Sequence, residues 1–334
     1  MRKKWMATIT VLTAAAILIG YYPLSAGAAE KYEEKFEKTV ALSKTGKVVL
    51  SNVSGSILIK TWDKAEVQID ALKVSKHSSM DKAKEYAGKV TIEIEKDGDI
   101  LTIKTRYPKP SIKKLNVSIT YELMIPNKAD LDAGTVSGSV EAYKTGGSTK
   151  LHTVSGKVHV EDVAGALRAS TTSGSVSIAR ASKGAKAHTV SGTLTIEDVD
   201  GDVDADCTSG KIVISNVKGS VTAKTVSGGI TMENIQGAEV VKASVLSGNV
   251  KYEGDILSDG TYNFKSHSGT VTLTIPAKSA FDLNAKTFSG SISSDFEITM
   301  SGKISKKRIQ GSVNGGGAEL DINTFSGSVR LKKK

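Results

Sequence analysis

Apolar and polar residues alternate along most of the chain after residue 30, a pattern that is typical of β-strands. In the first third of the chain the alternation is clearest over residues 56–60, 66–70 and 117–121. Residues 91–95 and 100–104 flank Lys96-Asp97-Gly98-Asp99, which predicts a hairpin turn. One short helix is expected from Met80 to Tyr86. The pattern as a whole predicts an all-β protein.

A Ser-Gly pair recurs at a fixed spacing from residue 137 onward. Six pairs, from Ser137-Gly138 to Ser227-Gly228, follow one another at intervals of 18 residues. The intervals then widen to 20 and 21 residues through Ser289-Gly290, and a last pair stands at Ser326-Gly327. A fixed period of this length is typical of a solenoid, in which one short unit stacks on copies of itself. It predicts a parallel β-helix, or β-solenoid, with about 18–21 residues per coil.

Each coil follows the pattern Thr-Val-Ser-Gly-x-Val-x-Ile-x-Asp-Val-x-Gly-x-Val-x-Ala-x, best seen in residues 189–206. The two glycines mark places where the backbone bends or is approached closely. Counting by twos from Val203 places Cys207 inside and Thr208 outside. The Thr208 column, however, is mostly valine in the other coils, which favours the opposite orientation. The pattern leaves open whether the Thr/Ser ladder or the Val column faces inward.

Four segments follow from these patterns. Residues 1–29 are a predicted signal peptide, and residues 30–130 are a β-rich capping region that covers the first open coil. Residues 131–290 are the β-solenoid of Ser-Gly repeats. Residues 291–334 form a C-terminal coil and cap with a basic tail. Because Phe288 and Phe325 replace the usual valine beside the Ser-Gly pair, we expect the core to widen there.

The first 29 residues have the features of an export signal. Arg2, Lys3 and Lys4 precede an apolar run that ends near Tyr22, and small residues follow, so cleavage is expected near Ala28/Ala29. The apolar run is short for a membrane span. We therefore expect an exported protein, in the periplasm, at the cell surface or outside the cell. Anchoring by an uncleaved N-terminal segment is the alternative.

Charge is concentrated at the C-terminal end. Without the three cations of the leader, 42 basic residues face 35 acidic ones, so the net charge falls from +10 to +7. A cationic C-terminal end can bind an anionic polymer or lipid of the envelope. Nucleic acid is not expected as a partner. Self-association through the solenoid ends and a solubilising role are the other interpretations. The weak surface-binding candidates are Lys306, Lys307, Arg308, Lys332, Lys333 and Lys334.

Metal-ligating residue types are present but sparse. The coil period brings His188 and Asp206 onto adjacent coils, and alternation points Asp202, Asp204 and Asp206 to one face. Zinc needs more donors than this pair supplies, and the glycine-rich repeat of calcium-binding β-rolls is missing. We expect no metal and no cofactor, with these four residues as weak candidates only.

Residues that could serve a reaction are either repeated or isolated. The serine of the Ser-Gly pair recurs in every coil and is therefore expected to be a turn residue and not a unique nucleophile. Cys207, the only cysteine, replaces the threonine of its column, and an exported chain with one cysteine has no internal disulfide. Aromatic residues make up only 5% of the chain, so platforms for sugar rings are few. We expect no catalytic residue.

Several motifs together resemble one bacterial family. These are the Thr-Val-Ser-Gly segments, the entry sequence at 42–48, Thr61-Trp62-Asp63 and the Gly-rich loop at 315–317. They are similar to the β-strand-repeat "putative adhesin" family of unknown function, which includes LiaG-like envelope proteins. The resemblance implies an exported β-solenoid with an adhesive or cell-envelope role.

We therefore expect an exported structural or interaction protein that binds a cell-surface or envelope component without catalysis. One alternative is a membrane-anchored envelope-stress accessory protein. A second is a carbohydrate-active β-helix enzyme, such as a polysaccharide lyase, which would need acids, basic residues and aromatic platforms in one groove.

Overall fold

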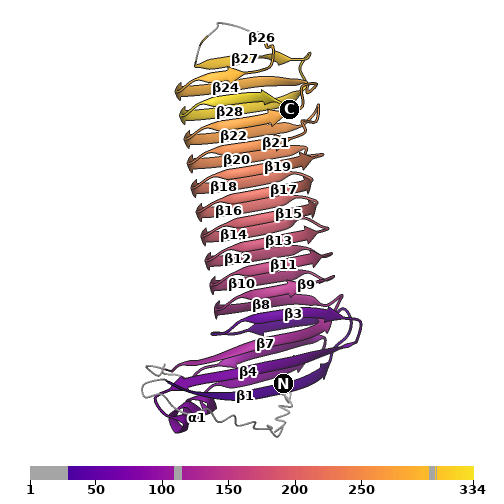
Figure 1. The fold of residues 1–334 in the computed structure, drawn as a ribbon. Coiled ribbons are helices and arrows are strands. Elements are labelled where there is room, and N and C mark those ends of the chain that lie inside the picture. Colours follow the sequence, from indigo (N-terminus) through magenta and orange to yellow (C-terminus); the bar gives the residue numbers. More distant parts are fainter. Residues whose placement is uncertain (1–28, 109–114, 301–304, 306) are drawn as a thin grey trace, which may run out of the picture.

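The computed structural model describes residues 29–108, 115–300, 305 and 307–334, so the predicted leader lies outside the described residues except for Ala29. Two long sheets run side by side along a column of stacked coils (Figure 1). Sheet A has 14 strands and sheet B has 15. The all-β solenoid predicted from the sequence is confirmed.

Each central coil contributes one strand to each sheet, and neighbouring coils pair in parallel. Parallel strands need a crossover, and here the other strand of the coil supplies it. The strands of sheet A are β9 (Val140–Tyr143), β11 (Val158–Val163), β13 (Val176–Ala181), β15 (Leu194–Asp200), β17 (Ile212–Lys218), β19 (Ile230–Gln236), β21 (Val250–Gly254) and β23 (Val271–Ile275). Those of sheet B are β8 (Asp130–Ser137), β10 (Thr149–Ser155), β12 (Leu167–Ser173), β14 (Ala185–Ser191), β16 (Val203–Ser209), β18 (Val221–Ser227), β20 (Val240–Ser247) and β22 (Thr261–Ser268).

The N-terminal end is built out of sequence order. Its elements are β1 (Glu30–Ala41), β2 (Lys47–Ser51), β3 (Ile57–Trp62), β4 (Glu66–His77), α1 (Met80–Gly88), β5 (Thr91–Asp97), β6 (Ile100–Arg106) and β7 (Val117–Pro126). The coil formed by β2 and β3 lies between β6–β7 and β8–β9. Antiparallel strands β4 and β1 then extend sheet A, and β5 extends sheet B. The expected short helix and the 96–99 hairpin are both confirmed.

The C-terminal end repeats this arrangement. It comprises β24 (Phe281–Ser289), β25 (Ile292–Ser294), β26 (Thr299–Met300), β27 (Arg308–Val313), β28 (Ala318–Ser326) and β29 (Val329–Lys333). Strand β28 pairs with β22 on one side and β24 on the other, while β29 lies between β23 and β25. The last coil of the chain is thus inserted one layer before the end, and antiparallel β27 covers β24.

The threonine beside the Ser-Gly pair faces inward and the valine faces outward, which answers the question that the sequence left open. Thr189 is fully buried, and its hydroxyl donates a hydrogen bond to the Gly174 carbonyl of the preceding coil at 3.2 Å. Val190 is 40% exposed. The chain therefore changes sides at the Ser-Gly corner, immediately after the exposed valine.

The predicted widening of the core at Phe288 and Phe325 is wrong. Both rings occupy the outward valine column and are 71% and 48% exposed. The side chains that enlarge the core near this end instead stand on inward positions of their strands. They are Tyr252, Tyr262, Phe264 and Phe281, all buried.

A second corner lies near the end of each strand of sheet A. The residue there has a φ of about 54° to 59° in six successive coils, and in four of them it is asparagine or aspartate, which tolerate this left-handed conformation better than most residues. This residue turns the next one inward, as in Val199 and Val217, which are buried. At the surface, the Asn216 amide donates to Asp198 at 2.9 Å and the Asn234 amide donates to Asn216 at 2.8 Å.

Candidate binding face

The outer face of sheet B carries parallel columns of side chains, because each coil presents the same positions in register. We call the column formed by the residue before the Ser-Gly pair the apolar column, and the one formed two residues earlier the middle column. In β18 these are Val226 and Lys224, with Thr225 buried between them. In spatial order from β14 the apolar column reads Val190, Thr208, Val226, Leu246, His267, Phe325 and Phe288.

The apolar column ends in a stack of three aromatic rings. His267, Phe325 and Phe288 come from β22, β28 and β24, which are neighbours in sheet B. Successive ring centroids are 4.8 Å apart and the ring planes differ by 5°. The central ring, Phe325, therefore has both faces covered by its neighbours. The stack presents ring edges to the solvent beside it.

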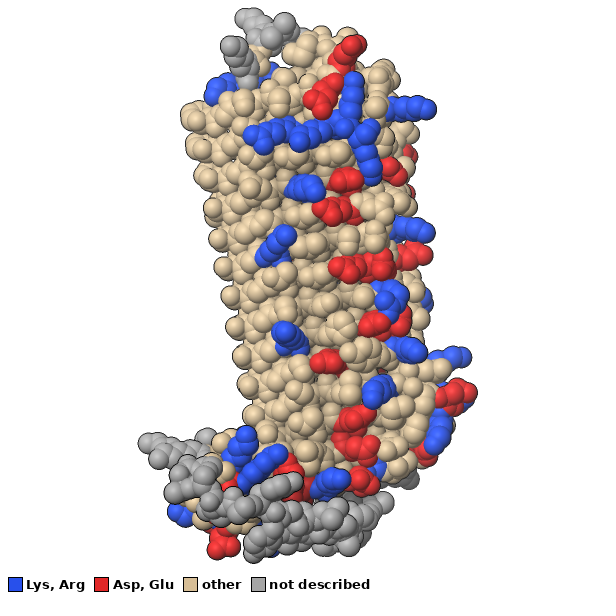
Figure 2. All heavy atoms as spheres, in the orientation of Figure 1, with Lys and Arg blue, Asp and Glu red and all other residues tan. Residues whose placement is uncertain are grey.

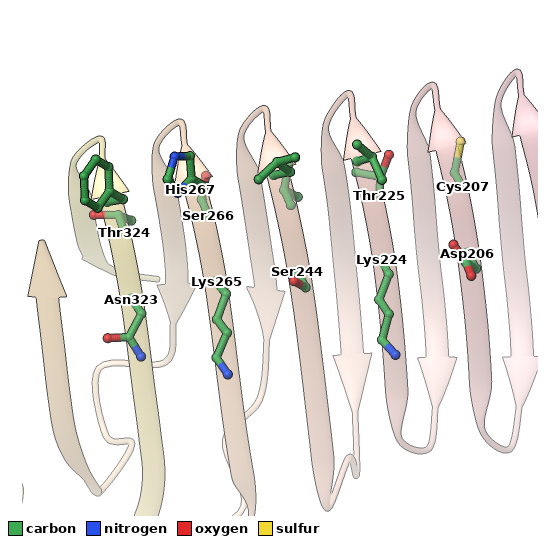
Figure 3. Close-up of a pocket in the computed structure, with 14 residues that line it drawn as sticks. Asp206, Cys207, Lys224, Thr225, Ser244, Lys265, Ser266, His267, Asn323 and Thr324 are labelled. Atoms are coloured by element: carbon green, nitrogen blue, oxygen red, sulfur yellow. The ribbon is translucent and has the colours of Figure 1, made fainter. Parts of the chain in front are cut away.

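A shallow groove of about 640 Å³ runs along these columns from β16 to β28 (Figure 3). Leu246 and Phe325 of the apolar column line it, together with hydroxyl and amide groups of Ser244 and Asn323. The groove crosses the strands and follows the long axis of the solenoid. Its shape therefore suits an extended partner better than a compact one.

Two lysines and one carboxylate line the groove, and the carboxylate of Asp206 stands beside Lys224 on the neighbouring strand. Lys224 and Lys265 lie in the middle column with exposed side chains (Figure 3). Within the described part of the chain, neither ammonium group has a carboxylate within salt-bridge distance. Asp206 is the only acidic residue among the lining residues and stands at one end. These lysines are therefore free to pair with an anionic group of a partner.

Cys207 lines the same groove from the buried threonine column. Its thiol lies 3.6 Å from the Gly192 carbonyl, in the place of the threonine hydroxyl of other coils. Burial raises the pKa of the Cys207 thiol, so little of the nucleophilic thiolate forms near neutral pH. This residue fills the ladder and has no feature of a reactive cysteine.

The weak metal candidates are only partly brought together. His188 and Asp206 are register partners on β14 and β16, with Nδ1 and Oδ2 3.9 Å apart. Asp204 also lies on the outer face of β16, but Asp202 precedes the strand and accepts a hydrogen bond from the Ser220 amide. Among the described residues, no group of three or more His, Cys, Asp or Glu side chains could hold a metal ion.

The basic C-terminal candidates divide between the two sheets. Arg308 lies on β27 in sheet B, whereas Lys332 and Lys333 lie on β29 in sheet A. The Lys307 ammonium donates to the Gly290 carbonyl at 3.1 Å, and Lys334 pairs with Glu253 at 2.9 Å. Lys306 is outside the described residues. Figure 2 shows basic side chains near this end of the visible face.

Sequence reasoning missed the groove lysines and the aromatic stack. The signal was present, since Lys224 and Lys265 hold equivalent positions in their coils, as do Val226 and His267. It could be used only after the orientation of the Thr-Val pair was known. Once the valine is outside, the phenylalanines of the same column must be outside as well.

The chain belongs to the Toastrack DUF4097 family, whose model matches residues 45–256 and 254–332. This membership agrees with the β-solenoid described above and with the family resemblance of the sequence. None of the curated proteins compared with the chain matches it. In the described residues, no helix is both long and apolar enough to cross a membrane.

Solved structures that match the chain include proteins from three bacteria. A "putative adhesin" from Bacteroides fragilis is 16% identical, with 72% of this chain and 96% of that chain covered and a TM-score of 0.39. A "putative cell adhesion protein" from Clostridium sporogenes is 11% identical, with 90% and 100% covered and a TM-score of 0.21. A "putative adhesin" from Parabacteroides distasonis is 10% identical, with 89% and 96% covered and a TM-score of 0.27.

Proposed function

We propose that this protein is an exported, non-catalytic binding protein that holds a component of the cell surface or envelope on the outer face of sheet B. The observation that carries the proposal is the groove along the middle and apolar columns, where exposed lysines stand beside exposed apolar side chains. A regular solenoid face presents equivalent positions at each coil, which suits a long or repetitive partner.

A binding role fits the chemistry of this face better than catalysis does. An active site needs a nucleophile or a general acid and base held at one place by unique neighbours. The groove offers groups that recur from coil to coil, and its one thiol has a raised pKa. Adhesin-like binding is therefore the activity that we propose, and release of cleaved products is not expected.

Export is the part of the proposal that rests on residues 1–29, with their basic start, apolar run and small residues. Mass spectrometry of the native protein should find a chain that begins at Ala29 or Glu30. A mature chain that still begins at Met1 or Arg2 would support the anchored alternative instead.

Binding can be tested with the full mature chain on immobilised envelope polymers and glycans, at low and at high salt. We expect binding that weakens as salt rises, because screening acts on exposed charges. The length distribution of each polysaccharide, measured before and after incubation, should stay unchanged. Absence of binding to every polymer, or shortening of a polysaccharide, would contradict the proposed function.

A further inference from the structure

The basic residues of the middle column stand on alternate strands of sheet B. Reading along the sheet from β18, the column carries Lys224, Ser244, Lys265, Asn323 and Lys286. Neighbouring strands of a sheet are about 4.8 Å apart, so successive lysines are separated by about 9.6 Å. Arg308 of β27, the register partner of Lys286, continues this row of cations at the next strand.

Two different kinds of group accompany the row of cations. On one side lies the apolar column, with Val226, Leu246 and Phe325 exposed to the groove. Between the lysines lie a hydroxyl and an amide, which donate and accept hydrogen bonds. A partner that fills the whole groove must therefore combine apolar surface, hydroxyl groups and regularly spaced negative charge.

We propose that this groove binds a linear polysaccharide that carries carboxylate groups, laid along the axis of the solenoid. The inference rests on the proposed function and names the class of partner. Sugar rings have apolar C–H faces that can pack on the apolar column. Their hydroxyls can bond to Ser244 and Asn323, and their carboxylates can pair with Lys224 and Lys265.

Other linear polyanions match the groove less completely. A polyol phosphate chain supplies charge but has no ring face for Leu246 and Phe325. A nucleic acid would need a series of separate aromatic faces on which successive bases stack, whereas the rings here stack on one another, with Phe325 between His267 and Phe288. Charge, hydroxyls and ring faces together favour the carboxylated polysaccharide.

The test uses the full mature chain and polygalacturonate as the linear carboxylated probe. Its fully methyl-esterified form is the matched control ligand, since it keeps the sugar backbone and loses the charges. We expect the Lys224→Gln/Lys265→Gln variant to bind polygalacturonate about tenfold more weakly than the natural protein, as for the loss of two exposed ion pairs. The esterified polymer should bind weakly to both proteins.

The control variant Lys183→Gln/Lys186→Gln removes the same charge. Both of its lysines are exposed, and they lie at the turn before β14 and on that strand, outside the groove. It should keep the affinity of the natural protein. All four positions are at the surface, so circular dichroism should show the same folded state and melting temperature in every variant.

Five outcomes would overturn the inference. Four of them are equal weakening by the two variants, full binding by Lys224→Gln/Lys265→Gln, tighter binding to a poly(glycerol phosphate) chain, and no binding to polygalacturonate. A loss that appears only in a Lys332→Gln/Lys333→Gln variant would also overturn it and would place the site on sheet A. In the first four cases, binding of another envelope polymer on sheet B would leave the proposed function standing, whereas a site on sheet A would contradict the proposed function as well.

Discussion

At the scale of the residue, the Ser-Gly pair is the point of closest approach between coils. A Cβ atom on Gly192 would lie only 1.8 Å from the carbonyl oxygen of Gly174 in the preceding coil, and the φ of Gly192 is +146°. That backbone conformation is almost confined to glycine. The inward threonine then donates to the same carbonyl, as Thr189 does to Gly174. Glycine and threonine are thus two parts of one contact.

This contact predicts a large cost for Gly192→Ala. The methyl group meets backbone that cannot move without breaking the sheet, so we expect a loss of about 3–5 kcal/mol in the free energy of unfolding. Gly237→Ala is the matched control, because Gly237 has a φ of +60° and nothing within 4 Å of its added Cβ. It should lose only about 1 kcal/mol, the cost of the left-handed conformation. If urea unfolding gives the same loss of unfolding free energy for both variants, the close approach between coils does not add to the cost of the substitution.

A buried polar network at the N-terminal end makes stability sensitive to high pH. The Tyr121 hydroxyl lies 2.8 Å from that of Thr105, which donates to the Asn52 side chain at 2.9 Å. Burial raises the pKa of Tyr121 to about 12, against the opposing effect of the Thr105 hydrogen bond. The unfolded chain, by contrast, ionises this phenol near pH 10.

Because the folded pKa is the higher one, this phenol favours the folded state below pH 10 and loses that contribution as pH rises toward 12. We expect a decline of roughly 2–3 kcal/mol across this interval from Tyr121 alone. In Tyr121→Phe the slope of unfolding free energy against pH should be shallower between pH 10 and 12. An unchanged slope would mean that the pKa of Tyr121 does not differ between the folded and the unfolded chain.

At the scale of the element, strand β24 shows how one segment serves two surfaces. Phe281 is buried and packs edge-on against Phe296, with ring centroids 5.5 Å apart. Phe288, at the other end of the strand, stands in the exposed stack. The same residue type therefore stabilises the core at one position and shapes the binding face at the other.

The two phenylalanines should respond differently to truncation. Phe281→Ala leaves a cavity and is expected to cost about 3–5 kcal/mol. Phe288→Ala removes a ring that is already mostly in water, so a loss below about 1 kcal/mol is expected. Chemical unfolding of both variants measures the difference. A large loss of unfolding free energy for Phe288→Ala would indicate that this ring belongs to the core, as the sequence predicted.

Sequence reasoning reached the strands but could not orient them beside the Ser-Gly pair. Alternation located the 96–99 hairpin and the coils, because strand periodicity is a local property. Hydrophobicity then conflicted with alternation at the Thr-Val step. In the fold, a buried threonine satisfies a glycine carbonyl and an exposed valine belongs to the outer face of sheet B. The groove could not be predicted, since it depends on the resolution of this conflict.

At the scale of the whole molecule, both ends insert a coil out of sequence order. The 37-residue interval before Ser326 looks like further repeats in the sequence. In the fold, β28 instead lies between β22 and β24, and β29 between β23 and β25. A period specifies the shape of a coil and not its place in the stack, so sequence could not reveal this order.

The inserted coil predicts that deletion of residues 318–334 exposes the C-terminal end. Without β28, strand β24 has lost its parallel partner, so β24 and β27 should lose most of their protection against hydrogen exchange. Strands β10 to β18 should keep theirs, because repeat arrays depend mainly on nearest neighbours. Exchange mass spectrometry resolves the two regions. Loss of protection along the entire column would show that the solenoid folds as one cooperative unit.

The central claim is that the outer face of sheet B binds an anionic partner along the groove. Lysine-selective chemical labelling of the full chain, with and without polygalacturonate, reads out each ammonium group separately by mass spectrometry. We predict that the polymer protects Lys224 and Lys265 and leaves Lys186 and Lys332 labelled as before. Protection of Lys332 and Lys333 alone, or equal labelling of all lysines in the presence of the polymer, would contradict this account.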